Sequence, residues 1–351
     1  MRNGVPLAEL TTLRLGGPAD TVVDATTEDE IVDTLIRADA AGRRLLVLAG
    51  GSNMVVADAG FRGTVLRIAT RGASIRRSDG RVRMVVAAGE PWRQVVDAAM
   101  ADGLSGIECL AGIPGTAGAT PIQNVGAYGQ QVSDSIASVR AYDRRERRML
   151  EIDRDRCGFG YRASRFRGTA RFVVVGVTLE LEQSRLGAPV GHAELARTLQ
   201  VELGERPPLA AVGAAVLSLR RQKGMVLDQT DPDSISVGSF FVNPVMSPWN
   251  FAELKRRAFE LLGHSMDVPA WPQPDGRTKT SAAWLIEQAG FKPGFGMGRV
   301  GISSKHTLAL VNRGGATTDE LIALARRIRL EVDRSFGIML APEPTLVGVD
   351  V

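Results

Sequence analysis

The alternation of apolar and polar positions predicts helices mixed with short strands along the chain. Residues 27–30 read TEDE, a capping box, and the apolar residues that follow at helical spacing predict a helix that ends near residue 42. The apolar run at 45–48 predicts a buried strand. Further elements of the first part are expected as strands at 54–56, 63–68 and 83–87 and a helix at about 91–103.

The same pattern continues through the second part of the chain, where helices and strands again alternate. Strands are expected at 138–143, 148–152 and 172–181, and helices at 193–203 and 209–222. In the last third we expect the strand GSFFVNPV, a helix opened by Ser247, the helix SAAWLIEQAG, the strand TLALVN, a capped helix from Thr317 and the edge strand MLAPEPTLVG. The mixture predicts the α+β class.

Residues 103–129 form a glycine-rich segment that interrupts this pattern. Such a run cannot bury a continuous core of its own, and it is too long for a simple connector. Loops of this kind are usually functional when a rigid scaffold holds them. We therefore expect part of a binding site here.

Composition excludes several classes of protein. The 351 residues are 44% hydrophobic and 23% charged, which is typical of a globular protein of two or three domains. The net charge of +4 is too small to indicate a nucleic-acid or membrane partner. There is no signal-peptide pattern, the two cysteines show no CxxC spacing, and the three histidines form no metal-binding motif. We expect a cytoplasmic protein without metal and with no obligate protein partner.

Two glycine loops follow apolar segments and are candidates for binding phosphate. Residues 50–53 read GGSN and residues 112–118 read GIPGTAG, and glycines let backbone N–H groups encircle a phosphate. Each loop alone is as consistent with a tight turn, but the pair favours a diphosphate, as in a dinucleotide. Residues 296–301 match GxGxxG but lie between a predicted helix and a predicted strand, so a Rossmann site is rejected there.

Three further segments contain candidate chemistry. Arg162 in GYRASRF has a guanidinium that can clamp a carboxylate, although a surface role is the default in an arginine-rich chain. Ser239 lies between glycine and two phenylalanines, where it is a candidate proton donor or a hydroxyl bonded to its own backbone. Glu343 lies between two prolines and is also consistent with a turn residue. No triad spacing indicates a hydrolase.

Seven segments together resemble the UDP-N-acetylenolpyruvoylglucosamine reductase family. In order they are LAGGSNMVV, AGIPGTAGATPIQNVGAYGQ, GYRASRF, GSFFVNP, SAAWLIEQAG, SSKHTLALVN and LAPEPTLVG. The resemblance implies a cytoplasmic flavoprotein of peptidoglycan synthesis. Such an enzyme reduces UDP-N-acetylglucosamine enolpyruvate to UDP-N-acetylmuramic acid with FAD and NADPH.

The resemblance also implies a domain organisation. It predicts an FAD-binding fold of the vanillyl-alcohol-oxidase type in two subdomains, 1–70 and 71–222, followed by an α+β substrate-binding domain, 223–337. The C-terminal strand in 338–351 is expected to return to the first subdomain.

Site residues follow from the matching positions. The expected FAD-binding residues are Gly50, Gly51, Ser52, Asn53, Met54, Gly112, Pro114, Gly115 and Thr116. The expected substrate-binding residues are Tyr128, Lys223, Asn243, Lys279 and Gln288. By the same resemblance, Arg162 and Glu343 flank the substrate carboxylate. Hydride passes from flavin N5 to C3, and Ser239 delivers the proton to C2.

One departure concerns the loop before residue 193. Long-form members of the family have a tyrosine there that closes on the substrate, whereas this sequence has His192 and no tyrosine between 187 and 195. Two alternatives stay open: another flavin-dependent oxidoreductase of the same fold, and a non-catalytic protein that binds a nucleotide sugar.

Overall fold

The computed structural model describes residues 1–78, 81–263 and 267–351. Its contacts divide the chain into two compact units, each described here by itself. Unit 1 comprises residues 1–5, 19–51 and 62–226, and unit 2 comprises residues 6–18, 52–61 and 227–351. The division into three parts expected from the sequence stays a prediction.

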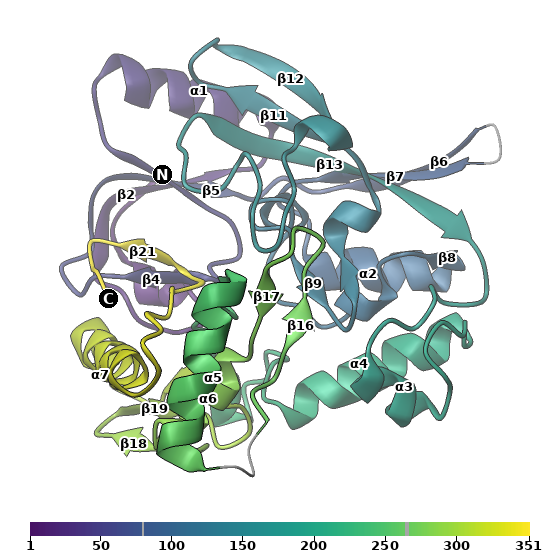
Figure 1. Cartoon of the computed structure of the whole chain (residues 1–351). Coiled ribbons are helices and arrows are strands. Elements are labelled where there is room, and N and C mark those ends of the chain that lie inside the picture. Colours follow the sequence, from purple (N-terminus) through teal and green to yellow (C-terminus); the bar gives the residue numbers. More distant parts are fainter. Residues whose placement is uncertain (79–80, 264–266) are drawn as a thin grey trace. The chain divides into compact units, whose positions relative to one another are not determined.

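The larger sheet of unit 1 is built on one long strand, β13 (Phe172–Gln183). Its strand order is β12-β11-β13-β7-β6, and β8 also pairs with β13 (Figure 1). The other strands are β6 (Ala73–Ser78), β7 (Arg81–Ala87), β8 (Leu104–Ser105), β11 (Ile136–Asp143) and β12 (Arg148–Asp153). Valine and leucine alternate or run continuously along β13, and most of this strand is buried. The predicted strands at 138–143, 148–152 and 172–181 are confirmed.

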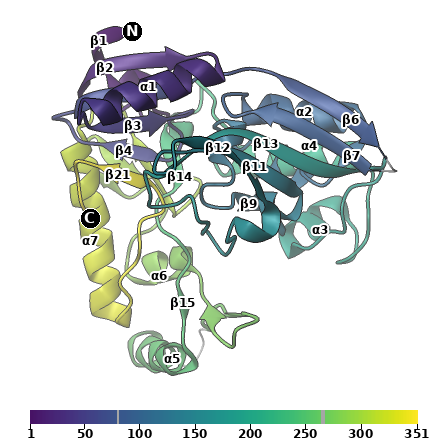
Figure 2. The ribbon, with the colours of Figure 1, turned by 90° about the horizontal axis from the view of Figure 1, so that it is seen from above.

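A second sheet of unit 1 has the order β1-β2-β5-β3. Its strands are β1 (Arg2–Pro6), β2 (Pro18–Ala25), β3 (Leu45–Leu48) and β5 (Phe61–Ile68). Helix α1 (Glu28–Ala40) packs on it, with Ile31 and Leu35 in the same core as Leu66 of β5 (Figure 2). The predicted capping box is present, because the Thr27 hydroxyl accepts from the Glu30 amide and the Glu30 carboxylate accepts from the Thr27 amide.

Three more helices complete unit 1: α2 (Trp92–Ala101), α3 (Ala193–Leu199) and α4 (Leu209–Gln222). The limits predicted for α4 are confirmed. Helix α3 is shorter than the predicted 193–203, because Gln200 adopts the left-handed conformation with φ 57° and ends the helix.

The glycine-rich segment 103–129 is packed far more tightly than the sequence indicates. It folds into short pieces, namely β8, the 3₁₀ helices η2 (Glu108–Leu110) and η3 (Ala117–Ala119), and β9 (Gly126–Ala127), which pairs with β10 (Gln130–Gln131). The side chains of Ile107, Leu110 and Ala117 are fully buried in the core of unit 1. The segment has no core of its own, as expected, but it shares that of the surrounding sheet and helices.

Unit 2 contains three small sheets. One has the order β14 (Ser236–Ser239), β20 (Ala309–Asn312), β19 (Val300–Ile302) and β18 (Gly296–Met297), and the second has the order β15 (Val245–Met246), β17 (Thr278–Lys279) and β16 (Trp271–Pro272). The third pairs β4 (Met54–Val56) with β21 (Thr345–Val347) in parallel. The strand predicted for GSFFVNPV is thus divided between β14 and β15. The rejected GxGxxG match forms the β18–β19 hairpin and opens no helix.

The helices of unit 2 begin at the predicted polar residues. They are α5 (Pro248–Leu262), α6 (Ala282–Gln288) and α7 (Thr318–Phe336), and the hydroxyls of Ser247, Ser281 and Thr317 cap them. Phe336, Phe240 and Phe241 lie in the core of this unit. No helix in the described part of the chain is long and apolar enough to cross a membrane.

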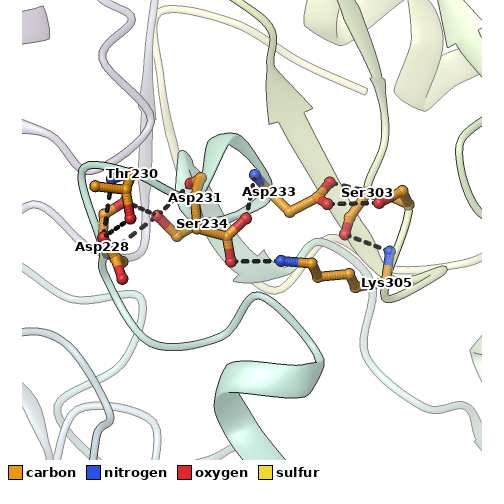
Figure 3. A network of polar contacts seen from close by, with 8 residues as sticks. Asp228, Thr230, Asp231, Asp233, Ser234, Ser303 and Lys305 are labelled. Carbon is orange, nitrogen blue, oxygen red and sulfur yellow. Dashed lines mark hydrogen bonds and ion pairs between the residues drawn. The ribbon is translucent and has the colours of Figure 1, made fainter.

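A polar network fixes the start of unit 2's main sheet (Figure 3). The Asp233 carboxylate, in the 3₁₀ helix η6 (Pro232–Ser234), accepts hydrogen bonds from the Ser304 amide at 2.9 Å and the Ser304 hydroxyl at 2.6 Å. Lys305 forms an ion pair with Asp231 at 2.8 Å. The segment 231–233 is therefore fastened to the turn before β20, and β14 starts two residues after the end of η6. The remaining 3₁₀ helices are η1 (Leu7–Leu10), η4 (Val132–Asp134) and η5 (Arg154–Arg156).

Candidate functional site

The two glycine loops meet in unit 1. A Cβ atom built on Gly50 would lie 2.8 Å from Cα of Gly115, so the backbones touch at a distance that a side chain would prevent. Gly115 has φ 117° and Gly112 has φ 73°, both in the region that favours glycine. The carbonyl of Gly115 accepts from the amide of Trp92 at 3.0 Å, which ties the loop to the start of α2.

Thr116 gives this loop an available donor. Its hydroxyl is buried, and no hydrogen-bond partner for it exists among the described residues. A buried hydroxyl without a partner is unfavourable, and it is satisfied when a ligand oxygen accepts its proton. The glycine cradle and this hydroxyl fit the diphosphate of the expected FAD, so Gly50, Gly51, Gly112, Gly115 and Thr116 are suited to hold it. Pro114, between them, stiffens the loop.

Ser52, Asn53 and Met54 belong to unit 2, where they lead into β4. The Asn53 carbonyl accepts from the Thr345 amide at 3.0 Å, and the Asn53 side-chain amide donates to the Glu343 carbonyl at 3.5 Å. Met54 pairs with Thr345 in the parallel ladder. These expected cofactor residues therefore also hold the C-terminal segment that carries Glu343.

A group of charged and polar side chains gathers around Tyr128 in unit 1. We call it the basic cluster, and its members are Tyr128, Arg162, His192, Glu194, Arg220 and Lys223. The Lys223 ammonium lies 5.6 Å from the centroid of the Tyr128 ring and 2.6 Å from a carboxylate oxygen of Glu194. The rings of His192 and Tyr128 meet edge to face with centroids 5.3 Å apart.

Burial governs protonation in the basic cluster. It raises the pKa of Tyr128 to about 12, although the Arg220 charge acts in the opposite direction. It also lowers the pKa of His192, the neighbouring Glu194 opposing the shift. Near neutral pH the phenol is therefore a neutral hydrogen-bond donor and the imidazole is uncharged. The positive charges come from the two arginines and the lysine.

Arg162 is fixed by the turn that precedes Tyr128. Its guanidinium donates to the carbonyls of Gly126 at 3.1 Å and Asn124 at 3.5 Å. Asn124 is buried, donates to Gln131 and to the Gly160 carbonyl, and accepts from the Ser133 amide. Arg162 has φ 51°, a left-handed conformation that is uncommon for arginine. The structure thus holds the Arg162 side chain against the turn that leads to Tyr128.

Ser239 and Glu343 lie on adjacent backbone segments of unit 2. The Glu343 amide donates to the Phe240 carbonyl at 2.8 Å, and the Phe240 amide donates to the Leu308 carbonyl at 2.7 Å. Phe240 is fully buried, whereas Ser239 is half-buried at the end of β14. Gly238 has φ 75°, and the register shifts between Ser236 and Ser239, so that Ser239 is paired with Ala309 of β20.

Asn243 and Lys279 also come together in unit 2. The Asn243 side-chain oxygen accepts from the Ala282 amide at 2.9 Å, in the first turn of α6. Lys279 pairs with Val245 in the β15–β17 ladder, and its ammonium lies 5.7 Å from the Trp271 ring centroid. Gln288 is the last residue of α6 and lies at the end opposite to Asn243. The structure does not gather Gln288 with the other two.

Three members of the basic cluster were not identified from the sequence as site residues. Arg220 lies in the RRQK segment, three residues before Lys223, and Glu194 lies in the segment where the lid tyrosine is missing. His192 was noted only as marking that gap. Their spacing to Tyr128 in the sequence gave no signal, because α4 and the turn at 128 meet only in the folded unit.

Comparison with known proteins identifies two families that parts of this chain match. Residues 19–149 match the family described as FAD binding domain, a range that includes both glycine loops. Residues 231–347 match the C-terminal domain of UDP-N-acetylenolpyruvoylglucosamine reductase. The predicted FAD-binding domain is therefore confirmed.

Relatives that match nearly the whole chain are named as the same reductase. The chain is 54% identical to UDP-N-acetylenolpyruvoylglucosamine reductase of Thermobifida fusca over 98% of this chain and 97% of that protein. It is 53% identical to the reductase of Streptomyces avermitilis over 99% and 94% of the two chains. The crystal structure of the reductase from Thermus caldophilus shares the fold, with a TM-score of 0.65 and 24% identity over 98% and 97% of the two chains. The chain belongs to the UDP-N-acetylenolpyruvoylglucosamine reductase family and is an FAD-dependent oxidoreductase.

Proposed function

We propose that this chain reduces UDP-N-acetylglucosamine enolpyruvate to UDP-N-acetylmuramic acid, with NADPH as the source of reducing equivalents. The observation that supports this most strongly is the identity of more than half of the residues to a named reductase over nearly the whole of both chains. The proposal includes a place in peptidoglycan precursor synthesis in the cytoplasm.

FAD, when bound, supplies the hydride that adds to C3 of the enolpyruvyl group. We propose that the glycine loops at 50–51 and 112–116 hold its diphosphate, with the Thr116 hydroxyl as a donor. Ser52, Asn53 and Met54 complete the expected set. Their direct bonds to the C-terminal segment link cofactor binding to the placement of Glu343.

Arg162 stabilises the charge that develops during reduction. Hydride addition at C3 leaves electron density on C2, and that density delocalises into the adjacent carboxylate. A guanidinium held in place by the Gly126 and Asn124 carbonyls can meet this charge without reorganising. Glu343, held through its backbone by Phe240, is the second residue proposed to contact this carboxylate.

Ser239 delivers the proton to C2. A serine hydroxyl is a weak acid in water, but the acceptor here is a strongly basic enolate. The half-buried position at the end of β14 keeps the hydroxyl on a rigid backbone next to the fully buried Phe240. This rigidity suits a group that must meet one carbon atom.

The expected substrate-binding residues contact the diphosphate and the sugar of the nucleotide sugar. Tyr128 and Lys223 supply a neutral phenol donor and an ammonium group from unit 1. Asn243, Lys279 and Gln288 are the expected contacts from unit 2. Because the Asn243 oxygen already accepts from the Ala282 amide, its NH₂ group is the part left to donate to substrate.

The visible spectrum and a pair of half-reactions test the function. We expect flavin absorption bands in the purified protein and NADPH oxidation that continues to turn over only when UDP-N-acetylglucosamine enolpyruvate is present. A colourless protein that binds UDP-sugars would instead be a binding protein. Oxidation that is indifferent to the enolpyruvyl sugar would indicate a different flavin-dependent oxidoreductase.

The Ser239→Ala variant tests the proton donor. Flavin reduction by NADPH should be unchanged, whereas turnover of the enolpyruvyl sugar should fall by about 10²-fold or more, because proton delivery by a positioned group contributes about that much. Stopped-flow measurement of each half-reaction separates the two steps. An equal loss in both would contradict the assignment and point to a folding defect.

A further inference from the structure

Arg220 has an unusual electrostatic position in unit 1. It lies in the last turn of α4 and is only 8% exposed. One terminal nitrogen donates to the Met225 carbonyl at 2.8 Å. Within the described residues, its Nε atom is buried without a hydrogen-bond partner, and no carboxylate forms an ion pair with it.

Burying a guanidinium without a counter-charge is unfavourable, and two half-buried arginines of unit 1 have a carboxylate beside them. Arg171 pairs with the buried Asp143 at 2.7 Å, and Arg206 pairs with Glu182 at 2.7 Å. Burial lowers the pKa of Arg220 to about 10, so the group still carries its charge near neutral pH. A charge kept under these conditions would be stabilised by an anion from a bound ligand.

The surroundings of Arg220 indicate where that anion binds. A Cβ atom on Gly112 would lie 3.7 Å from Nε of Arg220, so the guanidinium lies against the start of the second glycine loop. Its charge acts on Tyr128 and on Arg162. Together with Lys223 the basic cluster has three cations, whereas Glu194 is its one carboxylate.

We propose that Arg220 is a positioning residue for the diphosphate of the nucleotide sugar, supplying positive charge behind the Tyr128 hydroxyl. The inference rests on the proposed function, because it takes the basic cluster as the place where that diphosphate binds. The diphosphate of the substrate is favoured over that of FAD because Arg220 lies at the same end of α4 as Lys223, whose ammonium lies 5.6 Å from the centroid of the Tyr128 ring. The phenol is neutral and can donate its proton to a phosphate oxygen while the buried cation neutralises the phosphate charge.

The test compares Arg220→Met with Arg220→Lys in the FAD-bound protein. For Arg220→Met we expect UDP, titrated by calorimetry, to bind about 10- to 100-fold more weakly, as for the loss of one charge-assisted interaction. The KM for the enolpyruvyl sugar should rise to a similar extent, with kcat within about threefold. Arg220→Lys keeps the charge and should recover most of the affinity.

Arg206→Met is the matched control. It removes an arginine of the same unit whose charge is already neutralised by Glu182, so UDP should bind as in the wild type while the melting temperature falls. The melting temperature of Arg220→Met without UDP should fall less than that of Arg206→Met, because the substitution removes a buried charge that no carboxylate neutralises. A purely structural role would lower the melting temperature and leave the KM unchanged.

Three results would overturn the inference. The first is wild-type UDP affinity in Arg220→Met, and the second is a UDP affinity in Arg220→Lys that is as low as in Arg220→Met. The third is loss of FAD from Arg220→Met with normal UDP binding after FAD is restored, which would assign the Arg220 charge to cofactor binding. If Arg220→Met does not fold, Arg220→Gln is measured in the same way. A wild-type protein that does not bind UDP would contradict the proposed function itself, so the two failures are distinguishable.

Discussion

The basic cluster of unit 1 and the Ser239–Glu343 region of unit 2 are positioned by different forces. Arg162 is held by hydrogen bonds to the turn at 124–126, and Lys223 by an ion pair with Glu194. Ser239 and Glu343 are held through backbone bonds at Phe240, whose side chain is fully buried. Polar contacts thus place the charges of unit 1, whereas core packing places the reacting groups proposed for unit 2.

This difference fits two kinds of task. Cationic side chains held by hydrogen bonds or an ion pair can present their charge to a ligand from a defined position. A proton donor must meet one atom, and a hydroxyl on a short side chain is placed by its backbone. Mutations that remove packing should therefore affect unit 2 most, and mutations that remove polar contacts should affect binding in unit 1.

Phe240→Ala should have the largest effect. Truncating a fully buried phenylalanine should lower the free energy of unfolding by about 3–5 kcal/mol, and it should loosen the strand end that carries Ser239. Urea unfolding measures the first effect, and kcat for the enolpyruvyl sugar measures the second. Phe259→Ala, at a side chain in α5 that is 50% exposed, should change neither by much. Equal losses in the two variants would contradict the packing account.

Asn124→Ala should have an intermediate effect on stability and a clearer effect on binding. It leaves the Ser133 amide and the Gly160 carbonyl without their partner and should lower the free energy of unfolding by about 1–3 kcal/mol. Because the turn also holds Arg162, the KM for the substrate should rise as well. Asn3→Ala removes an exposed hydrogen bond to Thr21 and serves as the control. An unchanged KM in a destabilised Asn124→Ala protein would show that the turn does not position Arg162.

Glu194→Gln should have the smallest effect, and it should improve binding. The Glu194 carboxylate forms an ion pair with the Lys223 ammonium at 2.6 Å and would repel an incoming diphosphate. Its removal should lower the KM about two- to fivefold, which corresponds to less than about 1 kcal/mol, as for other partly exposed pairs. Glu182→Gln, which breaks the pair with Arg206, should leave the KM unchanged. A higher KM for Glu194→Gln would mean that Glu194 mainly orients Lys223.

The elements of strong periodicity were predictable from the sequence. The capping boxes at Thr27 and Thr317 and the limits of α4 are confirmed because local patterns fix them. Strand β6 was missed, since its residues are mostly exposed and rich in arginine. The end of α3 was missed because Gln200, not glycine, adopts the left-handed conformation.

Some candidate site residues could be identified from the residues next to them in the sequence. The glycine loops and the Ser239 segment stand out because their composition departs from that of ordinary strands and turns. Arg220 and Glu194 do not, since one is a basic residue in a last helical turn and the other an acidic residue in a first helical turn, both of which are common. Their significance depends on which charges surround them and on how deeply they are buried.

The sequence by itself determined the α+β class, most helices, the glycine loops and the family to which the chain belongs. These depend on local periodicity and on the order of motifs along the chain, which can be recognised without knowledge of the fold. Only the tertiary structure showed that Gly50 meets Gly115, that Phe240 holds both Ser239 and Glu343, and that Arg220 is buried without a carboxylate among the described residues. Contact and burial join residues far apart in the chain, and the electrostatic free energy of a charge is set by those neighbours.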